Sequence, residues 1–107
     1  MIVYRAITHN KADLRLDSLG LHYSTAKQSA YPYGDKIHLG YYYLYTCEIK
    51  LCDIDNYETA KANKEWPHEK EIVLKPGSEV LVTSVERIKM PCQTLLETIN
   101  LTFKTKA

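Results

Sequence analysis

Two glutamates, Glu69 and Glu71, stand two positions apart at the start of a β-branched apolar run that a Pro-Gly turn closes at 76–77. In a strand, residues two apart project from the same face, so we expect both carboxylates to enter one space while Lys70 points away. Two carboxylates that share a space repel each other, and active sites are where such pairs are put to use. The alternative is a solvated strand start with an incidental pair.

Arg5, Ser24 and Thr25 are the other residues whose types suit a site. Ser24 and Thr25 end a short expected strand and precede an expected helix. The alternatives are a surface ion pair for Arg5 and simple helix caps for the two hydroxyl residues.

The elements that must position these side chains are mostly short strands. Strands are expected at 2–7 and 21–25, a long central strand within 39–53, and a hairpin formed by 69–74 and 80–88 around a turn at 75–78. Short helices are expected within 26–30 and 55–65. The tail at 92–103 fits either a last strand or a helix, because Leu95, Leu96 and Ile99 have helical spacing.

Length and charge bound the class of protein. The chain has 107 residues and a formal net charge of +1. We expect residues 1–107 to form a single domain, and the charge does not favour a nucleic-acid partner. No apolar run approaches the roughly 20 residues that span a bilayer, and the N-terminus lacks the pattern of a signal peptide. We therefore expect no membrane partner and a cytoplasmic, monomeric protein.

The cysteines and histidines show no metal-binding spacing. Cys47, Cys52 and Cys92 form no CxxC pair, which indicates reduced thiols rather than a disulfide framework or a zinc site. The four histidines form no HExxH motif. We expect no metal.

The polar residues stand in an order that resembles a known family. An Arg in a first strand (Tyr4-Arg5), an aromatic-flanked Ser-Thr (22–26) and a Glu-x-Glu that opens a later strand (69–77) follow one another. This order is similar to that of the Arg/Ser-Thr-Ser/Glu-x-Glu class of mono-ADP-ribosyltransferases, the clostridial-toxin-like branch. The motifs span residues 5–71, and the strand order extends the likeness to about residue 88. Ala26 replaces the third residue of Ser-Thr-Ser, and the chain is short for the class.

The resemblance implies a fold and a reaction. The fold would be α+β, with two small, roughly perpendicular β-sheets that form an NAD cleft and with one or two short helices. The enzyme would be an NAD-dependent protein ADP-ribosyltransferase, a glycosyltransferase that breaks the nicotinamide–ribose bond and passes ADP-ribose to an acceptor. In this class a Glu at position 69 goes with arginine as the modified residue of the protein target.

The resemblance also implies a role for each site residue. Glu71 would bind the ribose 2′-OH and stabilise the oxocarbenium-like transition state, with Ser24 holding Glu71 in place. Glu69 would orient or deprotonate the acceptor, and Trp66 would meet the target. The residues implied for NAD binding are Arg5, at the diphosphate, with His22, Ser24, Thr25, Tyr31 and Tyr33. The two tyrosines and Trp66 could equally be packing residues, and His22 could be structural.

Two classes of function stay open at this point. The first is the transferase, which the small size would suit to a phage or toxin effector, such as an anti-CRISPR protein, that acts in the cytoplasm of a host bacterial cell. The second is a non-catalytic, β-rich binding or inhibitor module whose glutamate pair is incidental. Release of nicotinamide from NAD would separate the two, because water can replace a missing acceptor.

Overall fold

The computed structural model describes residues 1–9, 13–32 and 40–107 and is an α+β fold with one α-helix and a largely antiparallel sheet. In this part of the chain the strands are β1 (Ile2–Ile7), β2 (His22–Ser24), β3 (Tyr41–Glu48), β4 (Glu71–Val73), β5 (Glu79–Lys89), β6 (Thr94–Ile99) and β7 (Phe103–Lys106). The helix α1 is Asn56–Glu65, and the short 3₁₀ turns are η1 (Lys27–Ser29), η3 (Leu51–Asp53) and η4 (Pro67–Glu69). The α+β class expected from the sequence is confirmed at this level.

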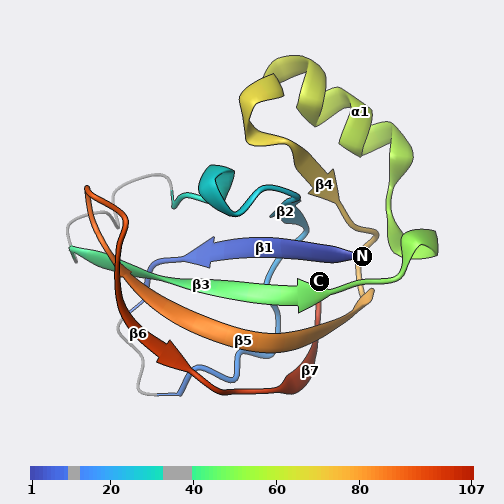
Figure 1. Cartoon of the computed structure of the whole chain (residues 1–107). Helices are drawn as coiled ribbons and strands as arrows, with labels where there is room; N and C mark the ends of the chain where they lie inside the picture. Colours follow the sequence, from blue (N-terminus) through green and yellow to red (C-terminus); the bar gives the residue numbers. More distant parts are fainter. Residues whose placement is uncertain (10–12, 33–39) are drawn as a thin grey trace.

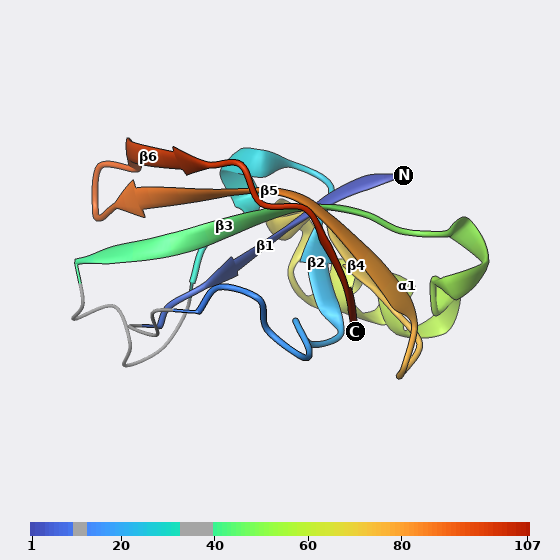
Figure 2. The ribbon, with the colours of Figure 1, turned by 90° about the horizontal axis from the view of Figure 1, so that it is seen from below.

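Hydrogen bonds join the seven described strands into one sheet. Its order is β4-β2-β1-β3-β5-β6, and β7 pairs with the first part of β5. All paired strands are antiparallel. Helix α1 lies at the β4 end and β6 at the opposite end (Figure 1). The sheet is strongly twisted, and β1, β3 and β5 fan apart toward one end (Figure 2).

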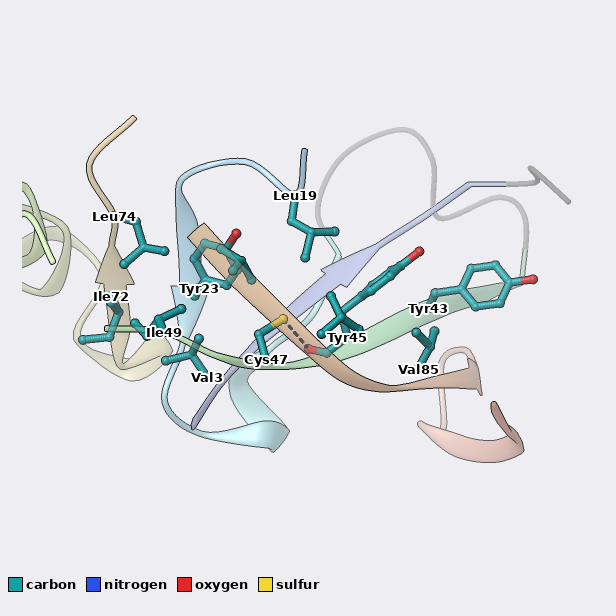
Figure 3. Packing of buried hydrophobic residues seen from close by; sticks show 12 residues of the cluster. Val3, Leu19, Tyr23, Tyr43, Tyr45, Cys47, Ile49, Ile72, Leu74 and Val85 are labelled. Carbon is teal, nitrogen blue, oxygen red and sulfur yellow. Dashed lines mark hydrogen bonds between the residues drawn. The ribbon is translucent and has the colours of Figure 1, made fainter. Parts of the chain in front are cut away.

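Strand β3 is the centre of the fold because its side chains are buried on both faces of the sheet. Tyr43, Tyr45 and Cys47 belong to the larger apolar cluster, whereas Tyr42 and Leu44 belong to a smaller one on the other face. The larger cluster collects side chains from several strands and from the loop before β2 (Figure 3). Successive strand residues point to opposite faces, so a run without polar gaps is buried on both. The expected central strand is thus confirmed, with narrower bounds.

The expected hairpin around 75–78 is wrong. Strand β4 pairs with β2 through Ser24 and Glu71, and β5 pairs with β3, so the two strands that the turn joins are not neighbours in the sheet. Gly77 does form a turn, at φ 78°, and Ser78 closes it by donating from Oγ to the Lys75 carbonyl at 2.6 Å. The turn signal was correct, but a turn does not determine which strands pair.

Of the two short helices expected from the sequence, one is a single 3₁₀ turn and the other is an α-helix, and the tail forms strands. The helix expected within 26–30 is only the single 3₁₀ turn η1, and no side chain caps it. The helix expected within 55–65 is α1, which begins where the Asp55 carboxylate accepts from the Glu58 N–H. In the tail, strands β6 and β7 replace the helical alternative. Across the described residues no helix has the length and apolar character that crossing a bilayer requires.

Candidate active site

A cavity of about 540 Å³ lies against the sheet face that carries the smaller apolar cluster. Strands β1 and β2 form its floor, the chain around η1 forms one wall, and α1 with the residues before β4 forms the other. Its lining residues are Tyr4, Arg5, Ala6, His22, Tyr23, Ser24, Ser29, Ala30, Tyr31, Glu58, Lys61, Ala62, Glu65, Trp66, Glu69 and Glu71. Residues of all three sequence motifs therefore meet at one cavity.

Three hydroxyl groups hold the backbone that leads into the Glu-x-Glu segment. Ser29 Oγ donates to the carbonyl of His68 at 3.1 Å, Ser24 Oγ to that of Glu69 at 2.7 Å, and Thr25 Oγ1 to that of Lys70 at 3.1 Å. The Thr25 N–H also donates to the Lys70 carbonyl at 3.0 Å. Three consecutive carbonyls are thus fixed from one short segment, and this is the local role of the Ser-Thr motif.

Glu69 and Glu71 reach the cavity by a route that differs from the expected one. Glu71 is the first residue of β4, but Glu69 ends the 3₁₀ turn η4 and is not in the strand. Pro67 begins η4, and Lys70 turns the chain with φ 48° and ψ 51°, in the left-handed region. The alternation rule of a strand therefore does not place the two carboxylates together. With the turn at Lys70, both residues nevertheless line the cavity.

Ser24 supports Glu71 through the backbone. The two residues are opposite each other in the β2–β4 pair, and the Ser24 hydroxyl contacts the Glu69 carbonyl. It also accepts from the Ala26 N–H at 3.2 Å. The partner of the Glu71 carboxylate is His22, whose Nδ1 lies 3.4 Å from it. His22 is exposed and Glu71 is mostly buried, so the imidazole is the more adjustable of the two.

Arg5 reaches from β1 past the short strand β2 and is anchored by carbonyls. Its Nε donates to the Leu19 carbonyl at 2.9 Å and its Nη1 to the His22 carbonyl at 3.2 Å. Burial lowers the pKa of Arg5 from its ordinary value, while Tyr23 and Glu71 act in the opposite direction. Among the described residues no carboxylate lies within ion-pair distance of Arg5. A partly buried cation without a paired anion is suited to an anionic ligand.

Helix α1 supplies a wall that the motifs do not reveal. Four of its residues line the cavity: Glu58, Lys61, Ala62 and Glu65. It also bonds to the edge of β4 that no described strand pairs with, where Thr59 Oγ1 accepts from the Val73 N–H at 2.9 Å and lies 3.3 Å from the Val73 carbonyl. Asn63 makes the corresponding bonds to Glu71. The signal in the sequence was two polar residues four apart on a helix directly before the Glu-x-Glu.

The remaining predicted site residues fall into three groups. Tyr31 and Trp66 line the cavity, and the Trp66 side chain is 57% exposed. Thr25 does not line it and acts through its bonds to Lys70. Tyr33 lies outside the described residues. Within those residues no three His, Cys, Asp or Glu side chains are grouped so that they could hold a metal ion.

Comparison with known proteins gives no relative for this chain. No family model matches it, and no curated protein or solved structure matches it either.

Proposed function

We propose that the chain is an NAD-dependent mono-ADP-ribosyltransferase that modifies a protein, with arginine as the acceptor side chain. One observation carries the proposal: Arg5, Ser24, Glu69 and Glu71, which are separated by up to 66 positions in the sequence, line one cavity. The residue types are those that cleavage of a charged N-glycosidic bond requires, namely a cation for the diphosphate and carboxylates for the developing positive charge.

The size of the cavity is compatible with a dinucleotide. Its volume of about 540 Å³ falls in the range of about 300–1,000 Å³ that small-molecule sites occupy. Arg5 would hold the diphosphate. Two of its five N–H donors are used on carbonyls, so the guanidinium is held in place, and Nη2, which donates to none of the described residues, would bind phosphate oxygens. Tyr4 and Tyr31 add ring faces against which a nicotinamide or adenine can stack.

The proposed reaction breaks one bond and forms one. The bond between ribose C1′ and the nicotinamide nitrogen breaks, and its electron pair leaves with nicotinamide. The ribose carbon gains positive charge, which the Glu71 carboxylate stabilises at short range. A guanidinium nitrogen of the target then bonds to C1′, and the proton it loses goes to Glu69. His22, next to Glu71, would orient that carboxylate.

The cavity would play the part that a cleft between two perpendicular sheets plays in the resembled enzymes. Here one sheet forms the floor, and α1 with the segment from Trp66 to Lys70 forms a wall. This arrangement would let a short chain build a dinucleotide site without a second complete sheet. It also makes α1, which the motifs do not predict, part of the proposed NAD site.

The first test measures nicotinamide release from NAD by the purified protein without a target. We expect slow release, because water replaces the acceptor, and release about 10²- to 10³-fold slower from the Glu71→Gln variant. The second test incubates the protein with labelled NAD and a bacterial lysate, looks for a labelled protein, and locates the ADP-ribose on it by mass spectrometry, where we expect an arginine side chain. A parent protein that is folded, binds no NAD and releases no nicotinamide would overturn the proposal and leave a non-catalytic binding module.

A further inference from the structure

The residues of α1 that line the cavity form one stripe along the helix. They are Glu58, Lys61, Ala62 and Glu65, whose spacing of three and four positions places them on one helix face. At 1.5 Å per residue, the two ends of the stripe are roughly 10 Å apart along the helix axis. Nothing in the proposed reaction uses the charges of this stripe.

The contacts between α1 and β4 determine which end of the stripe meets which part of the cavity. The Asn63 side chain bonds to the backbone of Glu71, whereas Thr59 bonds to Val73, two residues farther along β4. The beginning of α1 therefore lies beside Val73, and its last turn lies beside Glu71.

The Arg5 head group lies at the same level as the beginning of α1. Val73 pairs with His22 of β2, and Arg5 Nη1 donates to the His22 carbonyl at 3.2 Å. Helix side chains lean toward the N-terminus of their helix, so Lys61 reaches toward this level and Glu58 reaches beyond it. Along the cavity, starting from the motif glutamates, Glu58 therefore comes last.

Glu65 marks the opposite end of the stripe. It also lines a second cavity, of about 800 Å³, which adjoins the first and extends to the turn between β5 and β6. Glu58 and Lys61 line the first cavity alone. Glu58 and Glu65 thus carry the same charge on the same helix face but lie in different parts of the cavity.

The Glu58 carboxylate has no local partner. Glu58 is the third residue of α1 after the cap residue Asp55, a position from which a glutamate commonly accepts from the N–H of the cap residue. Here the Asp55 N–H donates to the Val73 carbonyl instead, at 2.8 Å. The half-buried carboxylate makes no hydrogen bond or ion pair with a described residue. Its oxygens are therefore available to the hydroxyl groups of a ligand in the cavity.

We propose that Glu58 binds the hydroxyl groups of the adenosine ribose and makes the site selective for NAD over NADP. The inference rests on the proposed function in one respect, the orientation of the dinucleotide: with the nicotinamide ribose at Glu71 and the diphosphate at Arg5, the adenosine ribose lies beyond Arg5, where Glu58 is. NADP carries a phosphate at the 2′ position of that ribose. A carboxylate accepts from a 2′-hydroxyl and repels a 2′-phosphate. In doubly wound α/β folds an acidic side chain makes the same distinction.

Lys61 does not reverse this preference, because it stands one turn nearer to Glu71, opposite Arg5. It makes no ion pair with a described residue and would hold the diphosphate from the α1 wall. The described lining of the first cavity also has four glutamates against two permanently charged cations, so a further phosphate is disfavoured there.

The test compares nicotinamide release from NAD and from NADP by the full chain. We expect kcat/KM to be at least about tenfold higher for NAD, because a phosphate dianion beside a carboxylate is repelled even at the dielectric constant of water. Glu58→Gln should reduce this preference about tenfold, and Glu58→Arg should reverse it. Equal kcat/KM for the two nucleotides in the parent protein would overturn the proposal.

Two variants on the same stripe locate the effect. Glu65→Gln makes the same change of charge at the other end and should leave the ratio of kcat/KM for NAD and NADP as in the parent. Lys61→Met should raise the KM for both nucleotides to a similar extent. Circular dichroism checks that each variant is folded. A shift of the ratio in Glu65→Gln as large as that in Glu58→Gln, or a loss confined to NADP in Lys61→Met, would refute the role of Glu58.

Binding of ADP-ribose and of its 2′-phosphate, neither of which contains the nicotinamide bond, separates this inference from the proposed function. Calorimetry that shows tighter binding of ADP-ribose, lost in Glu58→Gln, together with no nicotinamide release from NAD, would retain the selectivity and refute the transferase. Equal release from NAD and NADP would refute the selectivity and retain the transferase. A folded protein with neither binding nor release would refute both.

Discussion

The side-chain amide of Asn63 pairs with the backbone of Glu71 as a neighbouring strand would. Its Oδ1 accepts from the Glu71 N–H at 2.9 Å, and its Nδ2 donates to the Glu71 carbonyl at 2.9 Å and to the Thr59 carbonyl at 3.0 Å. On its other side β4 is bonded to β2. The residue proposed to stabilise the transition state is thus held from both sides, by a strand and by one side chain of α1.

Replacement of Asn63 by leucine, which has nearly the same shape, should affect both stability and turnover. Two half-buried backbone groups lose their partners, so the free energy of unfolding falls by about 1–3 kcal/mol. Nicotinamide release falls roughly tenfold to a hundredfold, because a small displacement of Glu71 weakens its contact with the ribose. Urea unfolding and a kcat measurement check the two effects.

The matched control for Asn63 is Thr59→Val. Thr59 bonds to Val73 as Asn63 does to Glu71, but Val73, unlike Glu71, lines neither cavity. Thr59→Val should therefore lower stability to a similar extent and leave kcat close to that of the parent protein. A similar loss of kcat in the two variants would mean that Asn63 contributes to stability alone.

The two glutamates should separate in their effects on the proposed reaction. Glu71→Gln lowers nicotinamide release and transfer together, by about 10²- to 10³-fold, the usual cost of one preorganised electrostatic group. Glu69→Gln leaves release measurable but nearly abolishes transfer to arginine, because a guanidinium that attacks must lose a proton and water needs less help. The measurements are nicotinamide release and labelling of an arginine substrate. Full transfer by Glu69→Gln would exclude arginine as the acceptor.

Arg5→Lys should raise the KM for NAD and also cost stability. A lysine carries one nitrogen and cannot reach both the Leu19 and the His22 carbonyls in the geometry of a guanidinium, so one of them loses its partner. We expect a loss of about 1–2 kcal/mol in unfolding free energy and a higher KM with a smaller change in kcat. Unchanged NAD affinity in a folded variant would remove Arg5 from the diphosphate site.

Two buried tyrosines should respond in opposite ways to loss of the hydroxyl. The Tyr23 hydroxyl is buried and has no hydrogen-bond partner among the described residues, whereas the Tyr45 hydroxyl donates to the Leu14 carbonyl at 2.9 Å. At neutral pH, Tyr23→Phe should stabilise the protein by up to about 1 kcal/mol, and Tyr45→Phe should destabilise it by about 1 kcal/mol. Urea unfolding of the two variants side by side is the measurement. A comparable loss in both would show that Tyr23 has a partner.

Tyr23, Tyr45 and the buried thiol of Cys47 predict that stability falls at alkaline pH. Burial raises the pKa of Tyr23 and Tyr45 above 10.0 and that of Cys47 from 9.0 to about 12. The unfolded chain releases these protons first, so stability is complete below about pH 9 and falls as the pH rises, first through Cys47. Each group contributes a slope of about 1.4 kcal/mol per pH unit. Tyr23→Phe should make the fall above about pH 10 less steep, which unfolding at several pH values measures.

The local features of this fold were predictable from the sequence, but the pairings were not. The strand Ile2–Ile7 lies where its β-branched and aromatic residues predict it, and the helix α1 lies within the expected range 55–65. The order of β4 beside β2 depends on contacts between residues about 49 positions apart, which no local pattern encodes. The β6 strand lies at the edge of the sheet with most of its side chains exposed, so it lacks the alternation that would have identified it.

For the candidate site too, the sequence predicted which residues take part better than it predicted how they are arranged. The motif residues converge as the order of motifs indicates, although Glu69 arrives through a turn at Lys70 rather than through a strand. The contribution of α1 was missed because its residues are polar on all sides, and a polar helix gives no apolar stripe that shows which face meets the sheet. Asn63 and Lys61 could be recognised only once the helix was placed against β4.

Helix α1 has no buried residue and is attached to the sheet largely through hydrogen bonds from its side chains. A ten-residue helix of this kind is marginal in water by itself, so this segment should open locally while β3 and its neighbours stay closed. Its amide protons should then exchange with solvent well before those of the central strands. A ligand that touches both α1 and β1 would slow that exchange, so the wall of the cavity is also a reporter of its occupancy.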